Sequence, residues 1–233
     1  MKRIATVGFL FLSGAVMVLG ALPSMANPVV IPNVNETDPG PSNQAFPYNQ
    51  GMMRVQQVFA MDQFQGETGT ITQIAFRVDE SAGYPFGPST PIDTEVRLCH
   101  TTAQPTAMSL NFADNYGADV TLVYDGALVL SSAGWPFFDI VIDLDPVFVY
   151  NGAQNLLVEY KVFSPAYTTQ FDAAGTGLGE GGTLWTDRVW AFDPNAVSGS
   201  SDGDDGYVTQ ITFGEPSPVT DTTWGRVRAS FLR

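Results

Sequence analysis

The chain has one cysteine and one histidine, Cys99 and His100, among its 233 residues. A single cysteine excludes an intramolecular disulfide, so the stability of the fold must come from its apolar core. Zinc and iron sites draw on several His or Cys ligands, and hydrolytic triads need a base beside the nucleophile. Adjacent residues of a strand point to opposite faces, so Cys99 and His100 are not expected to form a dyad. We interpret His100 as a strand residue that is hydrogen-bonded near the end of a sheet.

Basic residues are also scarce, with 10 Lys and Arg against 24 Asp and Glu. An acidic surface repels the phosphates of nucleic acids and anionic lipid headgroups, and it attracts divalent cations or basic partners. The balance therefore predicts a protein that does not bind nucleic acid. Acidity also favours solubility.

Long apolar runs are missing after residue 26, where no run approaches the roughly 18 residues needed to span a bilayer. We therefore expect no membrane span in the mature chain.

The first 26 residues do contain a long apolar run. Lys2 and Arg3 precede an apolar run from Ile4 to Leu22, and Ser24-Met25-Ala26 follows it. This order is typical of a secretory signal peptide cleaved near Ala26, with an uncleaved anchor as the alternative, and it predicts a secreted, extracellular protein.

Residues 27–50 are rich in Pro, Asn and Gly and lack periodicity. We expect them to form an extended leader or linker. Residues 51–233 are long enough for a single β-sandwich domain with a sizeable core.

Apolar and polar residues alternate with period two through most of that domain, which is typical of half-buried strands. The alternation predicts that Ile74, Phe76 and Val78 point into the core. In the same way it predicts a buried face of Leu156, Val158 and Tyr160. Glu159 falls on the opposite face beside Lys161, where we expect a surface ion pair. The expected strands lie at residues 53–64, 71–78, 94–101, 120–130, 137–144, 155–163, 183–192, 207–213 and 224–232.

Strands that follow one another without helical crossovers pair antiparallel. The fold class is therefore all-β, an antiparallel two-sheet β-sandwich, with a jelly roll as the first choice of topology. An immunoglobulin-type sandwich is the alternative, which the size of the domain and the missing Cys pair disfavour.

Five runs of this sequence, in order, are VQQVFAMDQF, ITQIAFRVD, NFADNYGADVTLVYDGAL, FDIVIDLDPVFVYNG and NLLVEYKVF. Together they resemble the ectodomain of secreted bacterial proteins that often end in a PEP-CTERM sorting tail. The resemblance covers roughly residues 53–213, and its motifs are strand and turn patterns. It implies an extracellular β-sandwich and no particular functional residues. The sorting tail itself is missing from this sequence.

Aromatic side chains in loops or on exposed sheet faces stack on the apolar faces of sugar rings. Trp135 lies in a turn-like stretch, and Trp185 shares one face of its strand with Asp187. We name Trp135, Trp185 and Asp187 as the candidate ligand-binding residues for a glycan or an extracellular matrix component. Trp190 falls on the opposite face and is expected in the core.

Three carboxylates, Asp202, Asp204 and Asp205, lie among glycines in residues 198–206. Calcium prefers hard oxygen ligands, and a divalent ion would relieve the mutual repulsion of these acids. They are the candidate calcium ligands, although their spacing is not that of an EF-hand. A solvated acidic loop is the alternative. Asp143, Asp172 and Asp193 are the acids considered as completing ligands.

The leading interpretation is a secreted noncatalytic β-sandwich with a surface, matrix or carbohydrate-binding role. One alternative is a secreted carboxylate-dependent polysaccharide hydrolase, which would need neither His nor Cys. The other is a self-assembling extracellular subunit that exchanges strands with its neighbours. A cleft with two close carboxylates would favour the hydrolase.

Overall fold

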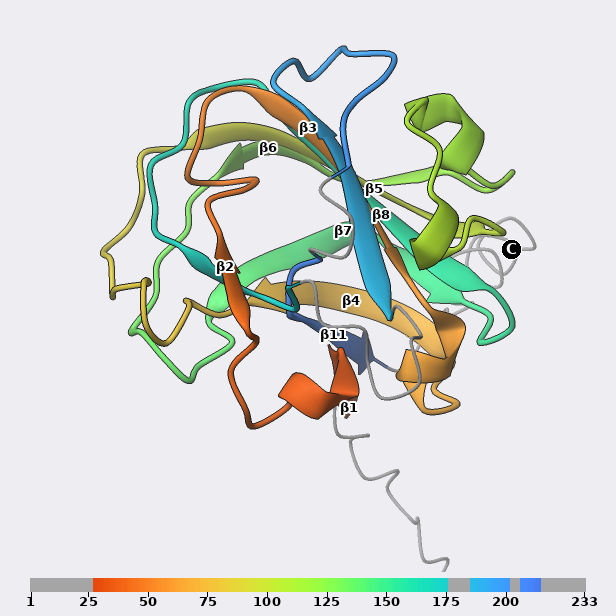
Figure 1. Cartoon of the computed structure of the whole chain (residues 1–233), viewed down its shortest axis with the longest axis horizontal. Coiled ribbons are helices and arrows are strands. Elements are labelled where there is room, and N and C mark those ends of the chain that lie inside the picture. Colours follow the sequence, from red (N-terminus) through yellow and green to blue (C-terminus); the bar gives the residue numbers. More distant parts are fainter. Residues whose placement is uncertain (1–26, 176–184, 202–205, 215–233) are drawn as a thin grey trace, which may run out of the picture.

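A computed structural model describes residues 27–175, 185–201 and 206–214 of the chain. This part is all-β, with short 3-10 helices in the connections (Figure 1). Its strands are β1 (Asn27–Ile31), β2 (Ser42–Gln44), β3 (Met53–Phe59), β4 (Gly69–Phe76), β5 (Ile92–Thr101), β6 (Thr121–Leu128), β7 (Ile140–Tyr150), β8 (Asn155–Val162), β9 (Phe171–Ala173), β10 (Thr186–Ala191) and β11 (Thr209–Gly214). Its 3-10 helices are η1 (Asn33–Asn35), η2 (Met61–Phe64), η3 (Pro105–Ala107) and η4 (Phe112–Asn115).

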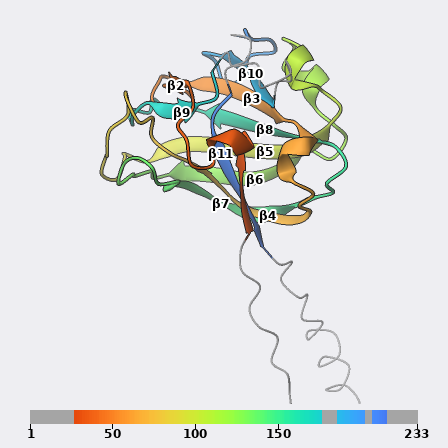
Figure 2. The ribbon, with the colours of Figure 1, turned by 60° about the horizontal axis from the view of Figure 1, so that its bottom comes forward.

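Two antiparallel sheets pack face to face and form a sandwich. One has the strand order β1-β11-β4-β7, and the other has the order β10-β3-β8-β5-β6. Figure 2 shows β3, β8, β5 and β6 side by side in this second sheet. A separate antiparallel pair joins β2 to β9.

The strand pairing confirms the jelly roll. If β2, β9 and β10 are set aside, eight strands remain, and the first pairs with the last (β1 with β11). The second pairs with the seventh (β3 with β8), the third with the sixth (β4 with β7) and the fourth with the fifth (β5 with β6). This nested pairing is that of one long hairpin rolled into two sheets.

The core lies between the sheets and is built from the faces that alternation predicts. Ile74, Phe76, Val158 and Tyr160 are wholly buried in one apolar cluster. Val78 and Leu156 belong to the same cluster, so all six predicted core residues are confirmed. Aromatic rings fill its centre, where the ring of Phe76 stacks on that of Phe171 at a centroid distance of 5.5 Å.

The segment expected to be a leader is part of the folded domain, so that prediction is wrong for residues 27–50. β1 pairs with β11 along its whole length, and Ile31 is fully buried. Tyr48, also fully buried, packs in the core. The segment contains several prolines and a strand of only five residues, which is too short to show a clear alternation. Its partner strand, β11, is also distant in sequence, so no local pattern indicates the pairing.

The expectation of a surface ion pair at Glu159 is also wrong. Residues 102–119 and 193–200 cover the outer face of the β3-β8-β5 sheet, where Phe112 stacks on the guanidinium of Arg54 at 4.4 Å. Glu159 exposes none of its surface, and its Oε1 accepts a hydrogen bond from Arg54 Nε at 2.7 Å. Gln56 Nε2 donates to the same oxygen at 3.1 Å. The outer face of this sheet is therefore also buried, and it contains the charged side chain of Glu159.

Candidate functional site

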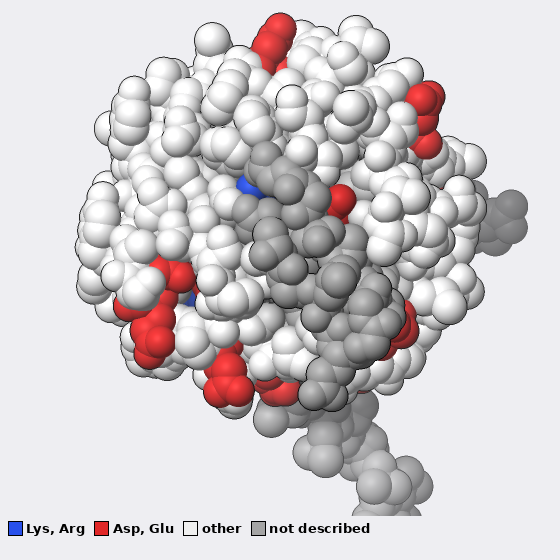
Figure 3. All heavy atoms as spheres, viewed as in Figure 1, with Lys and Arg blue, Asp and Glu red and all other residues white. Residues whose placement is uncertain are grey.

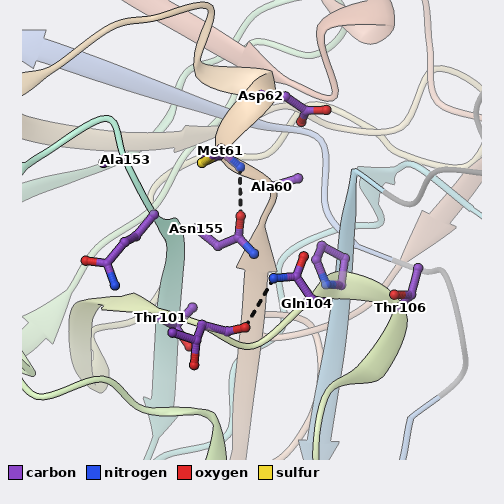
Figure 4. A pocket seen from close by; sticks show the side chains of 11 residues that line it. Ala60, Met61, Asp62, Thr101, Gln104, Thr106, Ala153 and Asn155 are labelled. Carbon is purple, nitrogen blue, oxygen red and sulfur yellow. Dashed lines mark hydrogen bonds between the residues drawn. The ribbon is translucent and has the colours of Figure 1, made fainter.

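A hollow of about 410 Å³ opens at the end of the sandwich where β3 and β5 end and β8 begins (Figure 4). Three connections build its walls: the step from β3 into η2, the loop from β5 into η3, and the turn between β7 and β8. The lining residues are Ala60, Met61, Asp62, Thr101, Thr102, Gln104, Pro105, Thr106, Ala153, Gln154 and Asn155.

Asn155, the first residue of β8, fixes two of these walls. Its Oδ1 accepts a hydrogen bond from the backbone N–H of Met61 at 2.9 Å, and its Nδ2 donates to the carbonyl of Ala103 at 2.8 Å. Only 7 % of the residue is exposed. Both ends of the amide are therefore used for structure, and Figure 4 shows the bond to Met61. Asn155 is a positioning residue for the hollow.

Most of the accessible lining surface is apolar, and the polar groups that remain accessible in it are mostly uncharged. Thr102, Thr106, Gln104 and Gln154 are exposed and offer hydroxyl and amide groups. Gln104 Nε2 donates to the carbonyl of Thr102 at 3.2 Å (Figure 4). Its amide oxygen, Oε1, takes no part in this bond. Among the described residues that line this hollow, Asp62 carries the single carboxylate. Such a set of donors and acceptors suits a neutral ligand rich in hydroxyl groups.

A second hollow, of about 260 Å³, adjoins the first and shares Thr101, Thr102 and Gln154 with it. We call the two together the end groove. The second hollow adds His100, Gly117, Ala118 and Asp119 to the lining. Its shape extends the site along the end of β5.

The side chain of His100 is held on both of its ring nitrogens. Nδ1 lies 2.5 Å from Oδ2 of Asp119, and Nε2 accepts a hydrogen bond from the backbone N–H of Asn151 at 3.0 Å. These contacts assign the ring proton of the neutral imidazole to Nδ1. The ring also stacks on Tyr150 at a centroid distance of 5.6 Å. With Nε2 occupied, the imidazole has no lone pair to offer a reacting group in this arrangement, and its position near a sheet end agrees with the sequence-based interpretation.

Cys99 points to the other face of β5, as predicted. It is buried with Val58 and Leu157 in a small apolar cluster separate from the main core. Burial raises the pKa of its thiol to about 11, although the N–H of Gly117 lies 3.5 Å from Sγ and opposes this rise. A thiol with so high a pKa is a poor nucleophile near neutral pH.

The predicted ligand residues do not form a single site. The backbone carbonyl of Trp185 accepts a hydrogen bond from the N–H of Ala60 at 2.9 Å, so half-buried Trp185 flanks the end groove. Asp187 exposes 6 % of its surface, and its Oδ1 accepts from the N–H of Arg188. Trp135 lies in the β6–β7 loop, at the opposite end of the sandwich.

Trp135 packs on a buried arginine. The guanidinium carbon of Arg77 lies 4.1 Å from the Trp135 ring centroid and 4.7 Å from that of Phe138. Arg77 Nε donates to Oδ2 of Asp172 at 2.7 Å, and its NH2 nitrogen donates to the carbonyl of Asn35 at 2.8 Å. Burial nevertheless raises the pKa of the Asp172 carboxyl, with Arg77 opposing it. This cluster clamps the N-terminal segment onto the sandwich. Trp135 also packs against the main core, as does Trp190, for which this position was predicted.

The candidate calcium ligands Asp202, Asp204 and Asp205 lie outside the described residues. Of the acids considered as completing ligands, Asp172 is paired with Arg77, and Asp143 accepts a hydrogen bond from Gln73. Asp193 Oδ1 accepts from the N–H of Asn195. Within the described residues, no group of three or more His, Cys, Asp or Glu side chains is arranged to hold a metal ion.

Sequence reasoning missed the residues that line the end groove, apart from the neighbouring Trp185. They come from the end of β5 and from four connections that are far apart in the chain, and each connection alone has an ordinary loop composition. No sequence pattern indicates that these residues lie together; the structure brings them together through the pairing of β5 with β8, which places Thr101 opposite Asn155.

In the part of the chain that the structure describes, no helix has the length and apolar character to cross a membrane. Comparisons of the chain with family models, with curated proteins and with solved structures found no match.

Proposed function

We propose that the protein is a secreted, noncatalytic β-sandwich that binds a neutral glycan of the extracellular surface or matrix in the end groove. The observation that carries this proposal is the lining of the groove. Its accessible polar groups are hydroxyls and amides, and the positions of its walls are fixed by the buried amide of Asn155. Hydroxyl and amide groups match the alternating donors and acceptors of a sugar ring.

Charge supports a neutral ligand over an anionic one. Asp62 and Asp119 lie in the two halves of the groove, and the described lining residues include neither Lys nor Arg. The face drawn in Figure 3 has Asp and Glu side chains spread widely over it, with only small areas of Lys and Arg. Uronic acids, sulfated sugars and sialic acids would therefore meet repulsion.

The chemistry of the groove also supports a role in binding. Of the two carboxylates among the described lining residues of the groove, Asp62 lies in one half, and Asp119 lies in the other half and is engaged by Nδ1 of His100, whereas hydrolysis of a glycosidic bond needs two carboxylates that flank the bond. His100 is engaged by Asp119 and by the N–H of Asn151. If these groups served catalysis, a hydrolase activity of the purified protein on esters, peptides or polysaccharides would be abolished by His100→Ala or Asp62→Asn. Such a result would contradict the noncatalytic role.

A glycan array with the purified mature protein tests the binding role. We expect neutral oligosaccharides to bind and acidic ones to be rejected. In a titration with the best neutral ligand, Gln104→Ala and Gln154→Ala should each weaken binding roughly tenfold, about the effect of one or two lost hydrogen bonds. Gln210→Ala is the matched control, because Gln210 lies on the outer face of β11, away from the groove. Equal effects of all three substitutions, or preference for acidic sugars, would overturn the proposal.

The extracellular location rests on residues 1–26 and on the family resemblance of the strand patterns. Expression of the full sequence in a bacterial host with N-terminal sequencing of the exported product tests it. We expect a chain beginning at Asn27. Recovery of the uncleaved chain in the membrane fraction would instead favour an anchor.

A further inference from the structure

His100, the only histidine of the chain, connects the two sheets at the edge of the end groove. It lies on β5 of the second sheet, and its ring packs against those of Phe148 and Tyr150 on β7 of the first sheet, at centroid distances of 5.0 and 5.6 Å. Its Nε2 accepts a hydrogen bond from the backbone N–H of Asn151, the residue after β7, at 3.0 Å. This bond, which we call the His100–Asn151 link, ties the start of the β7–β8 turn to β5.

The β7–β8 turn, residues 151–154, forms one wall of the end groove. Ala153 and Gln154 line the first hollow, and Gln154 also lines the second. Within the turn, Asn151 Oδ1 accepts from the N–H of Ala153 at 2.8 Å, and Asn151 Nδ2 donates to Oε1 of Gln154 at 3.1 Å. The position of Asn151 therefore determines where the amide of Gln154 lies in the groove.

The link exists only with a neutral imidazole. A backbone N–H is a donor and never an acceptor, so the bond from Asn151 needs a lone pair on Nε2 of His100. The ring proton is then on Nδ1, which faces Oδ2 of Asp119. A second proton can therefore bind only at Nε2. The imidazolium presents an N–H to the N–H of Asn151, and the link is lost.

Asp119 holds the ring in place in both states of charge. Its Oδ1 accepts from the backbone N–H of His100 at 3.0 Å, and its Oδ2 faces Nδ1 of the same residue. When the ring is charged, the contact with Nδ1 becomes an ion pair, which is stronger than a neutral hydrogen bond. Protonation thus strengthens the contact on one side of the ring and breaks the contact on the other, so the ring stays with Asp119 and the turn is released.

The other titratable groups near this ring, in the part of the chain that the structure describes, do not compete with it. Burial raises the pKa of the stacked Tyr150 phenol far above the physiological range. Cys99 points to the opposite face of β5, and burial raises the pKa of its thiol to about 11. Asp62 lines the first hollow, and Glu67 lines a different hollow beside β1. Histidine is the side chain whose charge ordinarily changes between about pH 8 and 5.

We propose that protonation of His100 regulates the end groove: the neutral imidazole holds the β7–β8 turn through the His100–Asn151 link, and the imidazolium releases it. The released turn takes the amide of Gln154 out of its position in the groove, so the groove binds its ligand more weakly in acid. The link itself needs no ligand, whereas its effect on binding rests on the proposed function.

Nuclear magnetic resonance tests the link directly, because the single histidine gives one set of imidazole signals. A titration from pH 8 to 5 gives the midpoint of the ring signals. Hydrogen exchange gives the protection of the Asn151 amide, relative to the intrinsic exchange rate at each pH. We expect this protection to fall roughly tenfold with the same midpoint, about the effect of one lost hydrogen bond. The amide of Leu98, on β5 between β6 and β8, is the internal control and should keep its protection.

His100→Gln is the matched variant, because a glutamine amide oxygen can accept the N–H of Asn151 and does not titrate. We expect the protection of Asn151 in this variant to stay constant from pH 8 to 5. Constant protection in the wild type, a ring that does not titrate in this range, or the same fall in His100→Gln would each overturn the proposal. The wild type alone also decides, since a fall in protection with a midpoint different from that of the ring would contradict the link.

Titration with a neutral oligosaccharide at pH 8, and again below the midpoint of the ring signals, tests the effect on the groove. We expect the affinity of the wild type to fall about fivefold or more in acid, and that of His100→Gln to stay constant. Equal wild-type affinities at the two pH values would overturn the regulation of the groove. A protein that binds no neutral glycan at either pH would contradict the proposed function, while the exchange of the Asn151 amide would still decide whether the link responds to protonation.

Discussion

The carboxylate of Glu159 and the guanidinium of Arg54 form an ion pair inside the protein, with Oε1 of Glu159 2.7 Å from Nε of Arg54. The Glu159 side chain is fully buried, and that of Arg54 is 11 % exposed. A second cation, Arg97, has its NH1 nitrogen 3.6 Å from Oε2 of Glu159. The covering segments shield this carboxylate from water, and the two arginines compensate its charge.

We expect Glu159→Ala to lower the free energy of unfolding by about 3–5 kcal/mol, because the substitution leaves the Arg54 charge buried without its partner. Urea denaturation measures this difference. Glu80→Ala is the control, since Glu80 is exposed and its loss should change the free energy by less than about 0.5 kcal/mol. Similar effects of the two substitutions would contradict the enclosed ion pair.

Phe76 lies at the centre of the main core, where its ring contacts those of Phe171, Tyr160 and Tyr207. Phe76→Ala should therefore lower the free energy of unfolding by about 3–5 kcal/mol through lost burial and the cavity that remains. Phe137→Ala serves as the comparison, because 58 % of Phe137 is exposed. If both substitutions cost the same in urea denaturation, the assignment of the core face is wrong.

Because Cys99 is buried, we predict that the free energy of unfolding depends on pH in the alkaline range. The thiol of the unfolded chain ionises near pH 8.5, whereas burial raises the pKa of folded Cys99 to about 11. Its contribution to stability is therefore complete below about pH 8.5 and is lost as the pH rises toward 11, because the unfolded state releases its proton first. We expect the free energy of unfolding to fall between pH 8.5 and 10, and we expect Cys99→Ala to flatten this fall.

The measurement is urea denaturation of both proteins at several pH values up to 9, because unfolded tyrosines, whose pKa is near 10, add their own ionisation above this range. Parallel curves for the wild type and Cys99→Ala would show that the thiol is not the cause. Thiol reagents offer a second check, because Cys99 should react at pH 8 only after unfolding.

We propose that Asp202, Asp204 and Asp205 bind calcium. A ligand bound only by the folded state at a hundred times its dissociation constant adds about 2.7 kcal/mol, which corresponds to a rise in Tm of roughly 5–10 °C. The melting temperature in millimolar calcium, compared with chelator, measures this effect, and replacement of the three residues by Asn should remove it. An unchanged Tm in calcium would leave a solvated acidic loop as the interpretation.

Alternation along single strands was sufficient to predict the fold class and the core face of β4 and β8. Val158 and Tyr160 are buried as predicted because their face meets the opposite sheet. The same rule failed for Glu159, since a strand pattern does not reveal that residues 102–119 and 193–200 cover the other face. The charges of Arg54 and Arg97 stabilise the Glu159 carboxylate at a buried position that the alternation assigns to the solvent-exposed face.

The candidate site was less predictable than the fold. Gln104 and Asn155 meet only because β5 pairs with β8, and neither residue has a local signal. Trp185, an aromatic on a predicted strand, flanks the groove through its backbone contact with Ala60. Trp135, an aromatic in a predicted turn, lies at the other end, against Arg77. Residue type indicates which chemistry a side chain offers, while topology determines where it is offered.

The pairing of β1 with β11 has a consequence for synthesis of the chain. Val29 lies opposite Ile211, so β1 leaves the ribosome about 180 residues before its partner strand exists. β3 and β4 likewise depend on later strands, β8 and β7. Nested pairing of this kind gives a high contact order and slow folding. The growing polypeptide thus cannot close either sheet early, and a truncation before Thr209 would deprive both β1 and one edge of β4 of their partner at once.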